Sequence, residues 1–195
     1  MTHPDLGPAA QRMAALIEGI SDDQLSAPCP CADITLGDLV HHISEFTIVF
    51  TGAAKKDKDV PSRGAPPDAS QLGDDWRTRI PRNLALLAEA WRDPEAWTGM
   101  TKAGGGDLPG EVAGIVALDE LVLHGWDVAR ASGQDYECDQ ETLEPVYSFV
   151  APFSVPGMEA QREGLFGPVV EVAEDAPLLD RLLGLAGRDP RWTPS

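Results

Sequence analysis

Helical periodicity dominates the arrangement of apolar and polar positions along this chain. Four segments place apolar residues three and four positions apart, as on one face of a helix, and they cover about residues 8–20, 36–54, 70–91 and 110–132. Thr35, with Asp38 three positions later, is a capping-box-like start for the second segment. Pro81 predicts a kink or a restart in the third segment, and Gly133 predicts the end of the fourth.

A smaller region follows the fourth segment. The stretch DQETLEPVYSFVAPF predicts a fifth helix, and the β-branched stretch LFGPVVEVA predicts a brief strand or an extended arm. DAPLLDRLLGLAG predicts a short terminal helix that is capped by Asp175 and ended by Gly187. We therefore predict one all-α domain, an antiparallel four-helix bundle over about residues 8–132 with a C-terminal extension over about 133–195.

Two long connections between the helical segments are predicted to be loops. KKDKDVPSRGAPPDAS is charged and rich in proline, and RDPEAWTGMTKAGGGDLPG is rich in glycine. The second lacks the preceding strand and the Lys-Ser/Thr pair of a phosphate-binding P-loop. It leads into the fourth helical segment, so a gate over a site on that helix is an alternative to a simple flexible connection.

Charge and composition exclude several classes of function. The chain has 195 residues and a net charge of −17, from 32 acidic and 15 basic residues, so it repels nucleic-acid backbones and anionic lipid surfaces. Its apolar runs are too short to span a membrane and its N-terminus lacks a secretory signal pattern, which favours a cytoplasmic protein. Three cysteines are too few for a disulfide framework, and we interpret Cys29 as a small buried thiol.

Candidate chemistry begins with the stretch LDELVLHGWDVA in the fourth helical segment. At about 100° per residue, His124 lies about 40° to one side of Glu120 and Asp127 about 20° to the other, so all three share one helix face. This face is either a solvated stripe or half of a site completed from elsewhere in the chain. Trp126 points to the opposite side and is interpreted as a packing residue.

The second helical segment offers the other half of such a site. Its apolar face is formed by Leu39, Ile43, Phe46 and Phe50. His42 shares this face and is predicted to point inward, whereas His41 is predicted to point outward. A lone inward histidine is more often a core residue than a ligand. Together with Glu120 and His124, however, His42 completes three ligands of the kinds that zinc prefers and leaves one position open, as in catalytic sites.

Other metal patterns fit less well. The HExxH motif of metalloproteases and the paired ExxH motifs of di-iron bundles are absent, so one metal ion is the economical interpretation. His and Glu ligands suit zinc best here, and also nickel, iron(II) or manganese. Arg77, Arg79 and Arg82 are weak candidates for binding the carboxylates of an acidic substrate or thiol cofactor, with a solvated helix face as the alternative.

Three segments resemble a known superfamily. TLGDLVHHI and ALDELVLHGWDVARASGQ are similar to motifs of the DinB-like, mycothiol-dependent maleylpyruvate isomerase N-terminal superfamily, and FGPVVEVAEDAPLLDRLLGLAGRDPRW resembles the tail of a subgroup described only as metal-binding proteins. The resemblance implies a four-helix bundle with a divalent metal, usually zinc, on His42, Glu120 and His124. It also implies that the isomerase proper carries an additional C-terminal domain, for which this chain is too short.

The resemblance adds a thiol to the expected chemistry. It implies a low-molecular-weight thiol of the mycothiol type, which the metal would activate for S-transfer to a small electrophile or for isomerisation. Asp127 would support the site or, equally, cap a neighbouring helix. A non-catalytic metal-binding or sensor protein and a buried polar network without metal are the alternatives. The expected partners are the thiol and the electrophile, with a homodimer left open.

Overall fold

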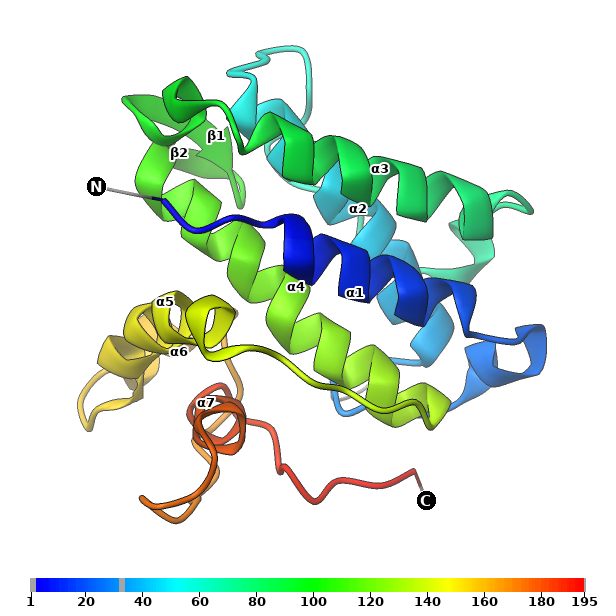
Figure 1. The fold of residues 1–195 in the computed structure, drawn as a ribbon, viewed down its shortest axis with the longest axis vertical. Coiled ribbons are helices and arrows are strands. Elements are labelled where there is room, and N and C mark those ends of the chain that lie inside the picture. Colours follow the sequence, from blue (N-terminus) through cyan, green and yellow to red (C-terminus); the bar gives the residue numbers. More distant parts are fainter. Residues whose placement is uncertain (1–2, 32–33, 195) are drawn as a thin grey trace.

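Four long helices are the main elements of the N-terminal two thirds of the chain. The computed structural model describes residues 3–31 and 34–194, and the four helices are α1 (Gly7–Glu18), α2 (Leu36–Ala54), α3 (Trp76–Ala90) and α4 (Gly110–Ser132). Helices α1 and α2 each pack against both α3 and α4 (Figure 1). Short 3-10 helices lie at Asp22–Ser26, Ala69–Gln71, Pro94–Trp97 and Ala151–Ser154. The predicted predominance of helix is confirmed.

The ends of the two helices that carry the candidate site follow directly from the sequence. The backbone N–H of Asp38 donates to Thr35 Oγ1 at 3.2 Å, and the N–H of Thr35 donates to Asp38 Oδ2 at 2.9 Å, so the predicted capping box starts α2. Helix α4 ends at Gly133, which adopts a left-handed φ of 72° that glycine tolerates without strain. These ends fix which residues of α2 and α4 face each other.

Helix α3 differs from its prediction at its start. It begins at Trp76 rather than near residue 70, because Gly73, with a φ of 71°, separates a 3-10 turn from the helix. The helix then runs through Pro81 to Ala90, so the predicted restart at this proline does not occur.

The glycine-rich connection before α4 is a β-hairpin, where a loop was predicted. Strands β1 (Met100–Ala103) and β2 (Gly106–Pro109) pair antiparallel, with Ala103 opposite Gly106. Both residues of the turn, Gly104 and Gly105, have positive φ, as a two-residue type I′ turn requires. The all-α prediction is therefore wrong at this small sheet.

The C-terminal region lies beside α4 (Figure 1). It contains α5 (Gln140–Val150), α6 (Glu159–Arg162) and α7 (Leu178–Leu185), and α5 packs against both α4 and α7. Residues 165–173 form no strand, so this segment matches the extended-arm alternative. Asp175 does not cap the terminal helix as predicted, because α7 begins three residues later with Pro177 at its N-cap.

The core fills the space among the long helices. Its largest side chains without solvent exposure include Met13, Ile43, Ile80 and Leu118, one from each long helix. Trp126 is buried as predicted, which leaves the opposite face of α4 for polar residues. In the described parts of the chain, no helix combines the length and apolarity required to cross a membrane.

Candidate metal site and adjoining pocket

His42 of α2 meets Glu120 and His124 of α4. The Nε2 atoms of His42 and His124 lie 3.2 and 3.1 Å from Glu120 Oε2. The three potential ligand atoms all lie within 4.8 Å of one another. His124 follows Glu120 by four residues, so one face of α4 supplies two of the three groups.

The three side chains are of the kinds that bind a divalent metal, and two of the separations between their ligand atoms suit one. Bond lengths of about 2.0–2.2 Å in a tetrahedral site place ligand atoms roughly 3.3 Å apart, close to the two short distances observed here. The His42 side chain is 30% exposed and the Glu120 side chain 24%. A small molecule can therefore approach a fourth position from solvent.

Asp127 contacts the ring nitrogen of His124 that does not face Glu120, and so orients the ring. It is fully buried, and its Oδ2 lies 2.9 Å from His124 Nδ1. With the Nδ1 proton donated to this carboxylate, Nε2 is the nitrogen that a metal ion could bind once the proton shared with Glu120 is displaced. Of the two predicted roles for Asp127, the structure shows the contact with the site and not a helix cap.

Arg188 is a member of this cluster that the sequence analysis did not identify. It follows α7, and its Nη2 donates to Asp127 Oδ2 at 3.0 Å. Burial alone would raise the pKa of Asp127, but Arg188 and the hydrogen bond from His124 lower it. The C-terminal region thus supplies the positive charge that keeps Asp127 ionised.

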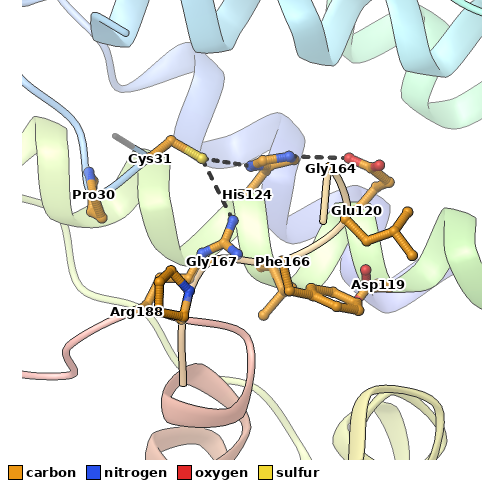
Figure 2. A pocket seen from close by; sticks show the side chains of 13 residues that line it. Pro30, Cys31, Asp119, Glu120, His124, Gly164, Phe166, Gly167 and Arg188 are labelled. Atoms are coloured by element: carbon orange, nitrogen blue, oxygen red, sulfur yellow. Dashed lines mark hydrogen bonds and ion pairs between the residues drawn. The ribbon is translucent and has the colours of Figure 1, made fainter. Parts of the chain in front are cut away.

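Cys31 is a second residue that the sequence analysis missed. Its thiol donates to Asp127 Oδ2 at 3.3 Å and lies 3.8 Å from His124 Nδ1. Figure 2 shows Cys31, His124 and Arg188 converging. Hydrogen bonding with Cys29 and burial raise the pKa of Cys31, so its thiol is protonated and is a poor nucleophile at neutral pH.

Cys31, His124 and Asp127 also have the spacing of a metal-binding group. The guanidinium of Arg188 already contacts this group, at 3.5 Å from the Cys31 sulfur and 3.0 Å from Asp127 Oδ2. Because Arg188 supplies the positive charge there, the geometry favours the His42, Glu120 and His124 group as the metal site.

The electrostatics of the cluster keep Glu120 ionised. Burial would raise its pKa, but hydrogen bonds from His124 and His42 lower it. Burial likewise would lower the pKa of His124, whereas its neighbours Cys31, Asp127 and Glu120 raise it well above the ordinary value. A metal ion that binds Nε2 must therefore displace a proton from this cluster.

A pocket of about 350 Å³ opens beside the cluster, between α4 and the C-terminal region. Its lining includes Cys31, Asp119, Glu120, His124, Phe166 and Arg188. Neither the hairpin of residues 100–109 nor any of Arg77, Arg79 and Arg82 lines it. The wall opposite α4 is instead the segment 164–168, so the structure does not support the predicted gate.

The three arginines have other contacts. Arg77 donates to the carbonyl of Ile20 and Arg79 to Ser44 Oγ, while Arg82 is exposed. The structure does not bring them to the histidine and carboxylate cluster.

His41 is buried, and the prediction that it points outward is wrong. Only 5% of it is exposed, and its Nδ1 accepts a hydrogen bond from the backbone N–H of Asp68 at 3.2 Å. The segment before α3 covers this side of α2, so the helix is buried on two faces. Cys29 is buried as predicted.

These features define a mostly helical protein with a two-histidine, one-glutamate cluster at the edge of a small pocket. A family model described as the mycothiol maleylpyruvate isomerase N-terminal domain matches residues 6–129. The chain belongs to this family.

Relatives of the whole chain are known in Mycobacterium tuberculosis. Uncharacterized protein Rv0738 of strain H37Rv and Uncharacterized protein MT0763 of strain CDC 1551 are each 26% identical over 189 residues. Each match covers 94% of this chain and 95% of the relative.

Solved structures share the fold. A crystal structure of the mycothiol-dependent maleylpyruvate isomerase matches with a TM-score of 0.68 and 14% identity, covering 95% of this chain and 88% of that chain. A histidine-to-alanine mutant of that isomerase matches with a TM-score of 0.57 and 13% identity, over 74% of this chain and 66% of the other.

Proposed function

We propose that this protein holds a divalent metal ion, zinc by preference, on His42, Glu120 and His124. There it activates a low-molecular-weight thiol of the mycothiol type for S-transfer or isomerisation of a small electrophile. The observation that carries the proposal is the convergence of three ligand atoms within 4.8 Å at the edge of a pocket. Membership of the isomerase family supports the choice of thiol.

Different residues of the chain would bind the metal ion and orient its ligands. His42, Glu120 and His124 would hold the ion, and Asp127 would keep His124 in the tautomer that presents Nε2. A divalent ion with an open position supplies Lewis acidity, which lowers the pKa of a thiol bound to it. The pocket wall at 164–168 would limit the access of water to that thiol.

The proposal extends to the whole chain. In it, the four long helices form an antiparallel DinB-like bundle, and residues 1–195 act as one domain in the cytoplasm. Support for a single domain comes from the Arg188 contact, which joins the C-terminal region to α4 at the site. A homodimer remains a prediction.

The adjacent histidines provide a matched pair for testing the metal site. Protein purified without a tag should contain close to one divalent ion per chain, measured by elemental analysis. We expect His42→Ala to lose the ion, and His41→Ala to retain it while losing stability, because the hydrogen bond of His41 goes to the Asp68 backbone and not to the cluster. Full metal content in His42→Ala, or equal loss in both variants, would contradict the assignment.

Cobalt substitution tests the thiol. Adding mycothiol to the cobalt protein should change its visible spectrum, because sulfur coordination introduces a charge-transfer band. A spectrum that does not change would show that no thiol reaches the metal. The non-catalytic metal-binding or sensor function would then be the better interpretation.

A further inference from the structure

Asp119 has no structural partner that would explain its position. It is 93% buried, since only 7% of it is exposed, and its Oδ1 has no hydrogen-bond partner in the described parts of the chain. Leaving a buried polar atom unpaired costs about 1–3 kcal/mol. An apolar side chain on this face of α4 would avoid that cost.

The accessible part of Asp119 belongs to the pocket beside the candidate metal site. Asp119 lines this pocket together with Glu120 and His124. Figure 2 shows Asp119 and Glu120 projecting from the same helix, with Phe166 near Asp119. A molecule that fills the pocket next to Glu120 therefore also meets the Asp119 carboxyl group.

The pocket wall opposite Asp119 is held in place by a buried side chain. Arg162 Nε donates to the carbonyl of Gly167 at 2.8 Å, and its Nη2 donates to the carbonyl of Leu185 at 2.6 Å. These bonds tie the segment 164–168 to the end of α7. The wall that lines the pocket with Asp119 is thus held in place from its own side, as a preorganised binding site requires.

We propose that Asp119 is a specificity-determining residue that accepts a hydrogen bond from an O–H or N–H group of the thiol. This inference rests on the proposed function, since it places the thiol sulfur at the metal and the rest of the thiol along α4. A ligand donor would reach the part of the carboxyl group that lines the pocket, whereas Oδ1 itself is fully buried. A thiol without such donors would leave that part unpaired and bind more weakly.

Two thiols and two variants test this contact. Cobalt-loaded wild type, Asp119→Leu and Asp119→Asn are titrated with mycothiol, which carries hydroxyl and amide donors, and with ethanethiol, which carries none. In Asp119→Leu we expect the affinity for mycothiol to fall about 10-fold or more, and that for ethanethiol to stay unchanged. Asp119→Asn should lose less, because its amide oxygen still accepts. Glu111→Leu, at an exposed position of the same helix, is the control.

The stability of the ligand-free protein provides the second measurement. We expect the Tm of Asp119→Leu without thiol to equal or exceed that of the wild type, because the substitution removes an unpaired buried group. A lower Tm, or equal loss of affinity for both thiols, would show a structural role and overturn the inference. If the wild type binds neither thiol, the proposed function fails and this inference fails with it.

Discussion

At the scale of single residues, Asp127 connects most of the cluster. Its Oδ2 receives hydrogen bonds from His124 Nδ1, Arg188 Nη2 and Cys31 Sγ, at 2.9, 3.0 and 3.3 Å. Those donors explain why a fully buried carboxylate can remain charged. Through these hydrogen bonds, Asp127 connects His124 of α4 to Arg188 in the C-terminal region and to Cys31 in the segment before α2.

Asp127→Asn should weaken metal binding without removing a ligand. The neutral amide would no longer stabilise the proton on His124 Nδ1, and its NH2 group favours the tautomer that blocks Nε2. We expect a loss of about 10–100-fold in metal affinity, measured by competition with a chromophoric chelator. Asp135→Asn, at an exposed position, is the control. Unchanged affinity would mean that Asp127 serves only to bind Arg188.

Helical spacing indicated the three proposed ligands, because it placed Glu120 and His124 on one face and His42 on the apolar face of its own helix, and the family resemblance then selected a metal site over a solvated stripe. It could not identify Cys31 or Arg188, which lie 96 and 61 positions from Asp127 and reach it through irregular segments. The error at His41 has a related cause, since periodicity cannot show that a later segment covers the second face of α2. Asp119 lay outside the predicted stripe, and only the pocket gives it a role.

At the scale of elements, the start of α2 determines the position of His42. Hydrogen bonds from the Thr35 side chain and backbone, and from the N–H of Ala69, lower the pKa of Asp38 below its ordinary value. The same carboxylate therefore caps α2 and attaches the segment before α3. A carboxyl group whose pKa is lower in the folded state stabilises the fold at any pH above its pKa in the unfolded state. This stabilisation is lost as the pH falls through the pKa of the folded state.

The direction of this pKa shift predicts how the stability of Asp38→Asn will depend on pH. At pH 7 we expect the variant to lose about 1 kcal/mol of unfolding free energy, the usual contribution of a cap. The difference from the wild type should shrink as pH falls below the ordinary aspartate pKa, because the unfolded carboxyl is protonated first. It should be smallest below the lowered folded-state pKa, where the folded carboxyl is protonated too. Urea unfolding at several pH values measures the difference in unfolding free energy between the variant and the wild type. Asp74→Asn, at an exposed position, is the control. A difference that does not depend on pH would contradict this role of the charge.

Element ends that depend on local chemistry were predictable, as the capping box of α2 and Gly133 of α4 show. The hairpin before α4 was missed although Gly104 and Gly105 form a recognisable two-residue turn, because its four-residue strands are too short to show alternation. The start of the terminal helix was misplaced because Asp175 and Pro177 are both acceptable start signals.

At the scale of the whole molecule, the long helices and the C-terminal region share the candidate site. Helices α2 and α4 supply the proposed ligands, whereas the segment 164–168 and Arg188 close the pocket from the other side. The family match covers residues 6–129, so the long helices lie mostly within it and the pocket wall lies outside. The C-terminal region, which lies outside the family match, thus supplies one wall of the pocket.

Arg162 is the residue on which this wall depends. It is 94% buried, since 6% is exposed, and it donates to Phe153, Gly167 and Leu185 carbonyls. Burial lowers its pKa below the ordinary arginine value, but arginine stays protonated in proteins. Its removal would leave several buried carbonyls without donors, at a cost of about 3 kcal/mol.

Arg162→Met should loosen the C-terminal region and leave the long helices intact. We expect faster hydrogen exchange, measured by mass spectrometry, in peptides that cover residues 153–188, and unchanged exchange in α1, α2 and α3. Metal content should stay near one ion per chain, because the proposed ligands lie on α2 and α4, while the affinity of the cobalt protein for the proposed thiol should fall as the wall moves. Arg191→Met, whose wild-type side chain is 87% exposed, is the matched control and should change none of these. Uniformly faster exchange would show instead that the two regions unfold as one unit, so that the C-terminal region could not vary independently of the helices that hold the metal.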